Sequence, residues 1–276
     1  MIRCAVTISL VPEARGGPFV FRDDLPAACR TAAQLGFDGV EIFPPSADAI
    51  PPNTLRTLLD EHHLKLAAVG TGAGWLKHKL TLTSGDAAIR QKAREFVRSI
   101  IDFAGLFGAP AIIGSMQGRW DESAGCDTAL RYLRDALDEL GDHARQYRIP
   151  LLYEPLNRME TNLVNTAADA VALVHSLATN NVRLLCDLYH MSIEEADIPT
   201  ALTMADTLLG HLHFVDSNRR PAGCGGLDYA PIAAVLEKIR YEGFVSAEAL
   251  PCPDSINAAR QTITTFRQYF RKTASV

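Results

Sequence analysis

Two histidines stand two residues apart in the segment GHLHFVDSNRR, Gly210 to Arg220, inside an apolar run typical of a β-strand. Alternate strand residues point to the same side, so the spacing allows a metal pair, a catalytic pair, or one ligand with a supporting neighbour. Three similar apolar runs end in carboxylates: PLLYE in Glu154, VRLLCD in Asp187 and FVSAE in Glu248. Three carboxylates and an imidazole are ligand types that suit a divalent cation.

These runs belong to a regular alternation of short β-rich segments with longer segments of helical pattern. The β-rich segments are RCAVTIS, GVEIF, LKLAAVG, AIIGS, PLLYE, VRLLCD, LLGHLHF and FVSAE. Alternation of this kind predicts parallel strands with crossover helices, and eight units favour a closed (β/α)8 TIM barrel over an open sheet. No linker-like stretch divides the chain, so we expect residues 1–276 to form a single barrel domain.

A barrel of this type carries its chemistry at the C-terminal ends of its strands. The fifth to eighth predicted strands end, in order, in Glu154, Asp187, His213 and Glu248. The alternative is a set of hydrogen-bonded residues at the barrel mouth, but like charges gathered there repel unless a cation or protons compensate. A closed structural zinc site would use more sulfur or nitrogen. We expect His213 to be the ligand, and His211 to lie one layer deeper, hydrogen-bonded to a polar neighbour.

The composition excludes some classes of function. The net charge of −5 offers no basic field for a polyanion, so we expect no nucleic-acid partner. The six cysteines are scattered without a CxxC pair, which indicates reduced thiols in a cytoplasmic protein. No apolar run reaches membrane length and the first residues do not resemble a signal peptide, so no membrane partner is expected.

Helix boundaries are marked at several places. Asp24 and Asn53 are expected to cap the starts of two helices. Gly36 and Gly243 stand between a helix and the next strand, where a left-handed conformation would end the helix.

Four long segments carry a resemblance to a known family. They are YEPLNRMETN (153–162), LLCDLYHMSIEE (184–195), GHLHFVDSNRRPAGCG (210–225) and YEGFVSAEAL (241–250). They resemble the xylose-isomerase-like sugar isomerase/epimerase superfamily and, within it, the D-tagatose/D-psicose 3-epimerase group. GFDGVEIF (36–43) resembles the second-strand signature of that family, so the resemblance covers most of the chain.

The resemblance assigns roles to individual positions. It implies one divalent metal ion, with Mn²⁺ as first choice and Mg²⁺, Co²⁺ or Zn²⁺ as alternatives, bound by Glu154, Asp187, His213 and Glu248. It implies that the catalytic acid/base pair is Glu154 and Glu248. The substrate-binding residues of the family fall on Glu160, His190 and Arg219, and His190 is expected in the loop after the sixth strand. The resemblance also implies a sugar substrate and a homo-oligomer, a dimer or tetramer.

The chemistry agrees with those roles. Removing a proton from a carbon beside a carbonyl needs a base and an electrophile that stabilises the enediolate, and a chelated metal supplies the second. We therefore expect a divalent-metal-dependent epimerase or isomerase of a keto-sugar or sugar derivative, working by proton transfer through a metal-bound enediolate. Glutamates on opposite faces of the carbon would invert it. A base on one face would interconvert an aldose and a ketose.

The sequence leaves the substrate and the exact reaction open. The loops 10–24, 70–75 and 114–120, and the CGG stretch 224–226, do not match the pocket segments of the epimerases, which leaves the sugar undetermined. A hydroxypyruvate-isomerase-like activity, or a keto-sugar or inosose lyase or dehydratase, would use the same metal site. An endonuclease is disfavoured because that branch uses a histidine-rich multi-zinc site, and a sugar-binding protein because binding alone needs no acid/base pair.

Some further residues are expected near the site. Glu41 lies within an apolar run and should face the mouth or pair with a polar neighbour. Residues in loops after the third and fourth strands that could line a pocket are Trp75, His78, Arg119 and Trp120.

Overall fold

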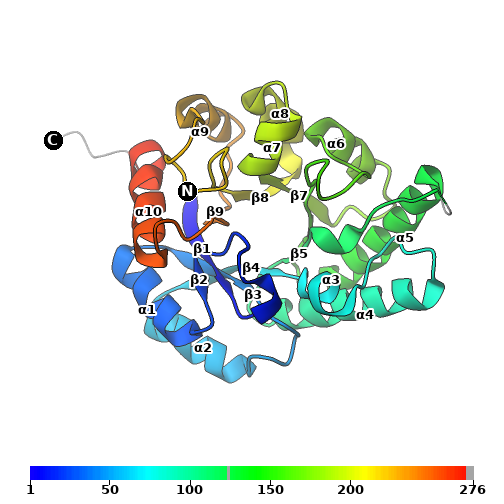
Figure 1. The fold of residues 1–276 in the computed structure, drawn as a ribbon, viewed down its shortest axis with the longest axis horizontal. Coiled ribbons are helices and arrows are strands. Elements are labelled where there is room, and N and C mark those ends of the chain that lie inside the picture. The colour runs from blue at the N-terminus through cyan, green and yellow to red at the C-terminus, as the bar shows by residue number, and fades with distance from the viewer. Residues whose placement is uncertain (123–124, 272–276) are drawn as a thin grey trace.

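Eight parallel strands close into a barrel in the computed structural model, which describes residues 1–122 and 125–271 (Figure 1). The barrel strands are β1 (Arg3–Ser9), β3 (Gly39–Phe43), β4 (Lys65–Gly70), β5 (Ala111–Ile113), β6 (Leu151–Tyr153), β7 (Val182–Asp187), β8 (Leu209–His213) and β9 (Phe244–Ala247). From β3 onward each strand pairs with the next along the chain, and β1 pairs with both β3 and β9, which closes the ring. The TIM barrel predicted from the β/α alternation is confirmed.

One short strand is additional to the barrel. The two residues of β2 (Phe21–Arg22) pair with the C-terminal end of β1, in the register Ile8 to Phe21. The register of β9 on β1 stops at Val6, so β2 pairs with the part of β1 that β9 leaves free. This pairing holds the loop 10–24 against the mouth of the barrel.

Helices surround the sheet (Figure 1). The long ones are α1 (Leu25–Leu35), α2 (Pro52–Glu61), α4 (Ala87–Gly105), α5 (Cys126–Arg145), α6 (Ala167–His175), α8 (Ile198–Ala205), α9 (Tyr229–Lys238) and α10 (Ser255–Phe270). Shorter pieces at the strand ends are α3 (Ala73–His78), α7 (Leu188–Glu194) and the 3₁₀ turns η1 (Pro12–Ala14), η2 (Ser115–Gln117) and η3 (Asp206–Leu208). No helix among the described residues is long and apolar enough to cross a membrane.

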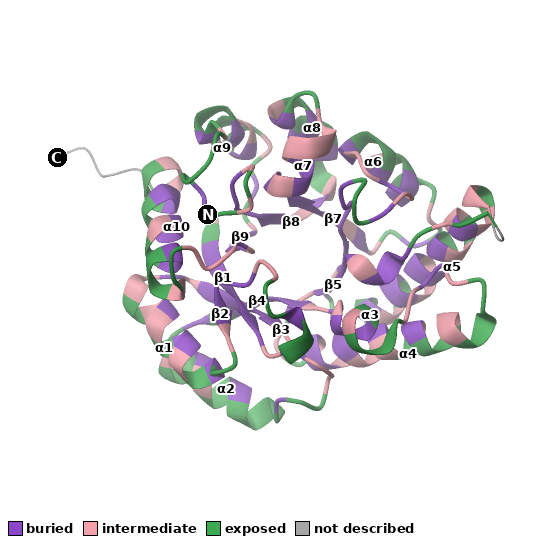
Figure 2. Cartoon of the chain, in the orientation of Figure 1, coloured by how far each residue is buried: buried purple, intermediate pink, exposed green. Residues whose placement is uncertain are grey.

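Burial follows this layered arrangement, with buried strands at the centre and helices buried on one face and exposed on the other (Figure 2). The main core lies between sheet and helices. A separate small cluster includes Leu152 and Leu185. These two residues precede Glu154 and Asp187 by two positions, so they share the same side of their strands. Apolar packing therefore fills the part of the layer beneath Glu154 and Asp187.

Two of the four predicted helix markers are confirmed. The Asp24 carboxylate accepts from the Ala27 N–H at 2.9 Å, and Gly36 ends α1 with φ of 88°. The prediction for Asn53 was wrong, because α2 already begins at Pro52, whose missing N–H suits a first helical position. The prediction for Gly243 was also wrong, since Arg240 takes the left-handed conformation at φ 56°.

Candidate functional site

The four predicted metal ligands meet at the C-terminal rim of the barrel. Asp187 and His213 are the last residues of β7 and β8, and Glu154 and Glu248 directly follow β6 and β9. One ligand atom from each of the four lies within 4.8 Å of the others. Adjacent parallel strands thus bring together side chains that are up to 94 residues apart, which the strand-end argument predicts.

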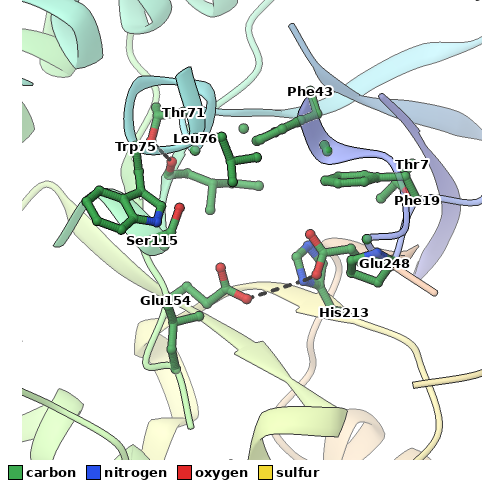
Figure 3. A pocket seen from close by; sticks show the side chains of 18 of the residues that line it. Thr7, Phe19, Phe43, Thr71, Trp75, Leu76, Ser115, Glu154, His213 and Glu248 are labelled. Atoms are coloured by element: carbon green, nitrogen blue, oxygen red, sulfur yellow. Dashed lines mark hydrogen bonds and ion pairs between the residues drawn. The ribbon is translucent and has the colours of Figure 1, made fainter. Parts of the chain in front are cut away.

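Nδ1 of His213 lies among the three carboxylates. It is 3.2 Å from Oδ2 of Asp187. It is also 3.4 Å from Oε1 of Glu154 and 3.6 Å from Oε2 of Glu248, which Figure 3 shows beside His213. All four side chains are buried except that of Glu248, which is 16% exposed. The cluster is open to the cavity on the side of Glu248.

The donor set fits a divalent cation. Oε1 of Glu154 is buried and has no hydrogen-bond partner among the described residues, although it faces the cluster. A buried carboxylate oxygen without a partner is costly unless something not yet present satisfies it. Three carboxylates and one imidazole match the ligand preferences of Mn²⁺, Mg²⁺ or Co²⁺ better than those of a sulfur-rich zinc site.

The charges of the cluster perturb one another. Burial raises the pKa of Glu248 to about 8, against the lowering effect of His213 and Arg219. Burial alone would raise the pKa of Asp187, but His190 and His213 hold it below its usual range. Burial would lower the pKa of His213, yet Glu41 and Glu248 raise it well above its usual value. Without a cation, protons therefore compensate part of the negative charge.

Glu41 connects the two histidines of β8. Nε2 of His211 lies 2.8 Å from its Oε2, and Nε2 of His213 lies 3.2 Å from its Oε1. The histidines keep the pKa of Glu41 well below its usual range despite burial, so this group is a carboxylate and can only accept. Nε2 of His213 then carries the proton and Nδ1 is left as the ligand atom.

The two histidines of β8 lie in different surroundings. His211 supports Glu41 one layer below the cluster, as predicted, and His213 faces the site. Glu41, His211 and His213 are also close enough to hold an ion themselves. Hydrogen bonds to Glu41 already use the Nε2 atoms of both rings, however, so this group acts as a support for the four-residue site.

A cavity of about 410 Å³ opens above the cluster. It is lined by both candidate catalytic glutamates and by all three residues predicted to bind substrate, Glu160, His190 and Arg219. The geometry therefore brings the predicted set together around one space. Asp187 does not line the cavity, because it lies fully buried beneath it.

Arg219 joins two carboxylates across the mouth. Its Nη1 donates to Oε1 of Glu160 at 2.9 Å and its Nη2 to Oε2 of Glu248 at 3.1 Å. The guanidinium also lies 4.6 Å from the ring centre of Tyr189. Arg220, the next residue, is exposed. Arg219 is thus held in a position where it contacts both the cluster and the cavity.

His190 lies in the short helix α7, and not in a loop as predicted. The helix starts directly after β7 because the Asp187 side chain accepts from the N–H groups of Tyr189 and His190 and so caps it. Nδ1 of His190 accepts from the Asn157 backbone N–H at 3.3 Å and lies 2.8 Å from its side-chain nitrogen. Nε2 therefore carries the proton. It is buried, makes no hydrogen bond to any described residue, and lies 3.9 Å from Oε1 of Glu154.

Several residues of the site escaped the sequence reasoning. Asn157 was inside the quoted segment YEPLNRMETN, but only its glutamates were considered. Gln117 donates to the Glu154 carbonyl at 3.0 Å and accepts from the Tyr153 hydroxyl at 2.7 Å. A Cβ at Gly114 would lie 2.5 Å from Oε2 of Glu154, so a larger residue there would displace this carboxylate.

Loops of the N-terminal half form the opposite wall. Phe19 and Phe43 stack with ring centres 4.7 Å apart and both line the cavity. Trp75 and Ser115 lie together at one end of the pocket, away from His213 and Glu248 (Figure 3). Of the four predicted wall residues, Trp75 lines this cavity and Arg119 a neighbouring one. His78 and Trp120 line neither.

Comparisons with known proteins identify the family and the fold. The family described as "Xylose isomerase-like TIM barrel" matches residues 29–269. The chain is 32% identical to D-psicose 3-epimerase of Agrobacterium fabrum over 240 residues, covering 86% of this chain and 80% of that protein. It is 32% identical to 3-dehydro-D-guloside 4-epimerase of Escherichia coli over 142 residues, covering 51% of this chain and 54% of that protein.

A solved structure shares the fold over nearly the whole length. D-allulose 3-epimerase from Methylomonas sp., in complex with D-allulose, superposes with a TM-score of 0.81 at 24% identity. The match covers 98% of this chain and 97% of that one.

Proposed function

The chain belongs to the xylose isomerase-like TIM barrel family, and from this premise we propose that it is a divalent-metal-dependent epimerase of a keto-sugar. Its relatives are named epimerases, which makes it an enzyme of the isomerase class. The observation that carries the proposal is the pair of glutamates, Glu154 and Glu248, which both line one cavity and lie 3.4 Å and 3.6 Å from Nδ1 of His213.

The residues that would hold the ion are Glu154, Asp187, His213 and Glu248. A divalent ion bound there would stabilise negative charge on two neighbouring substrate oxygens. We propose Mn²⁺ as the native metal, with Mg²⁺, Co²⁺ and Zn²⁺ as alternatives, because the donor set is rich in oxygen.

The side chains of this protein supply the proton transfer. One of the two glutamates takes the proton from the carbon beside the carbonyl, and the other returns a proton to the opposite face. Nε2 of His190 and the guanidinium of Arg219 point into the same cavity, where they donate hydrogen bonds to substrate oxygens. Phe19 and Phe43 exclude water on the opposite side.

The test is turnover of ketoses in deuterated water by the metal-loaded enzyme. Epimerisation with solvent deuterium at the inverted carbon is the expected result. An aldose product would indicate an isomerase, and a dehydrated product a lyase acting from the same site. Inversion without deuterium would contradict the proton-transfer mechanism.

Glu248→Gln tests the acid/base role, because it keeps the shape of the side chain and removes the base. We expect turnover to fall by about 10² to 10⁴-fold while sugar binding is largely kept. Glu61→Gln, at the exposed end of α2, is the matched control. Unchanged turnover in Glu248→Gln would refute the assignment.

A second candidate is inversion of carbon 4 in a keto-glycoside, which is favoured by the similarity to 3-dehydro-D-guloside 4-epimerase.

Two further proposals concern the cellular compartment and the oligomeric state of the enzyme. The six cysteines are all free, which supports a reducing, cytoplasmic environment. The dimer or tetramer expected from the resemblance stays a prediction, to be checked by light scattering.

A further inference from the structure

A second cavity adjoins the one above the metal-ligand cluster. Its volume is about 540 Å³, and it lies between the loops that follow β4, β5 and β6. Trp75, Ser115 and Glu160 line both cavities and so form the boundary between them. The first cavity alone already lies within the range of about 300 to 1,000 Å³ that holds small ligands. A single sugar ring therefore leaves the second space unused.

The lining of the second cavity combines polar groups with the indole of Trp75, whose ring centre lies 4.8 Å from Nζ of Lys79. Trp75 is 38% exposed, and its Nε1 has no acceptor among the described residues. Trp120 differs, since its Nε1 donates to the Asn162 carbonyl at 2.9 Å. The hydroxyls of Thr81 and Ser115 likewise make no hydrogen bond within the described part of the chain.

These features match the surface of a saccharide. A sugar ring presents C–H groups that pack on an aromatic face and hydroxyls that pair with polar side chains. Arg119 adds a cationic group to the lining, and its Nη1 donates to the Met159 carbonyl at 3.2 Å. The carboxylate of Glu160, 39% exposed and bonded to Arg219, stands at the boundary where a linkage between two rings would pass.

We infer that the second cavity is a subsite for a second sugar ring, so that the substrate is a glycosylated keto-sugar. The inference rests on the proposed epimerase function. The keto ring lies over the cluster of Glu154, His213 and Glu248, and the attached ring lies beyond Trp75, next to Arg119.

Gly85 offers a way to fill the subsite without touching the metal site. It lines the second cavity only, and a Cβ built there would meet nothing within 4 Å. Gly85→Phe should therefore occupy space that the second ring needs, and Gly85→Ala is the matched control at the same position. Melting temperature and metal affinity show whether either variant has disturbed the fold.

The experiment compares D-fructose with two disaccharides that contain it, lactulose and isomaltulose, in turnover and in calorimetric binding to the metal-loaded enzyme. We expect at least one disaccharide to exceed D-fructose by about tenfold in kcat/KM or affinity. Gly85→Phe should remove that advantage and leave D-fructose unchanged, and Gly85→Ala should keep it.

Two results would overturn the subsite: wild-type enzyme that prefers D-fructose to both disaccharides, or an advantage that survives in Gly85→Phe. Turnover of D-fructose alone would leave the epimerase function standing and remove the subsite. Tighter disaccharide binding that Gly85→Phe abolishes, without any turnover, would support the subsite and contradict the epimerase function.

Discussion

Nε2 of His213, on β8, lies 3.2 Å from the carboxylate of Glu41, which belongs to β3 and is 172 residues away in the sequence. The contact assigns the proton of the imidazole to the nitrogen that faces away from the site. Once the imidazole has lost its second proton, Nδ1 is therefore the free nitrogen, and it lies between Glu154, Asp187 and Glu248. Glu41 thus orients the ring of His213, which we propose as a metal ligand, and is not itself one of the four proposed ligands.

Glu41→Gln should weaken metal binding by about 10 to 100-fold, the usual effect of losing a group that orients a ligand. The amide can no longer hold both rings as a carboxylate does. Titration calorimetry of the metal-free protein measures the affinity, with Glu61→Gln as control. Turnover should recover at saturating metal, and an unchanged affinity would contradict the positioning role.

Metal affinity should rise with pH between about 6 and 8. Glu248 has its pKa raised to about 8 and His213 has its pKa raised as well, so both hold protons in this range when no cation is bound. A cation must displace these protons, which lowers apparent affinity about tenfold per pH unit for each proton displaced. Calorimetry in buffers of different ionisation enthalpy counts the protons released. An affinity independent of pH would show that the site binds no competing proton.

Arg219→Lys should lower kcat/KM by about tenfold or more, because an ammonium cannot reach Glu160 and Glu248 with two donors of fixed geometry. Arg220→Lys is the matched control, since this neighbour is exposed and its change should leave kinetics unaltered. Steady-state kinetics on the best sugar of the panel measures both. Equal effects in the two variants would argue against a specific role of the Arg219 fork.

Asn157→Ala should raise KM by about tenfold, the worth of one hydrogen bond to a substrate oxygen. The substitution removes the side-chain nitrogen that lies 2.8 Å from Nδ1 of His190 and leaves only the longer contact with the backbone N–H, at 3.3 Å, to keep the ring proton on Nε2. His190→Ala should show the same increase, and the double variant should add little. Metal affinity should stay near that of the wild type. Additive effects would indicate that Asn157 acts independently of His190.

The amino-acid sequence by itself determined that the chain forms a barrel and that the candidate site lies at the C-terminal ends of its strands. Strand identity follows from local apolar patterns, and the residue at each strand end follows from reading where the pattern stops. Asp187 and His213 were found in this way, as were Glu154 and Glu248 one residue beyond their strands. Predictions from local patterns were wrong at two helix ends. The helix expected to be capped by Asn53 already begins at Pro52, and Arg240 takes the left-handed conformation that was expected at Gly243.

Only the tertiary structure decided how these residues are supported. Glu41 meets His211 and His213 across at least 170 residues of sequence, and Asn157 meets His190 across 33. Such contacts depend on which side chains the closed barrel brings together from distant parts of the chain, and local patterns do not encode these pairs. The second cavity depends likewise on three loops that approach one another only when the strands beneath them are paired.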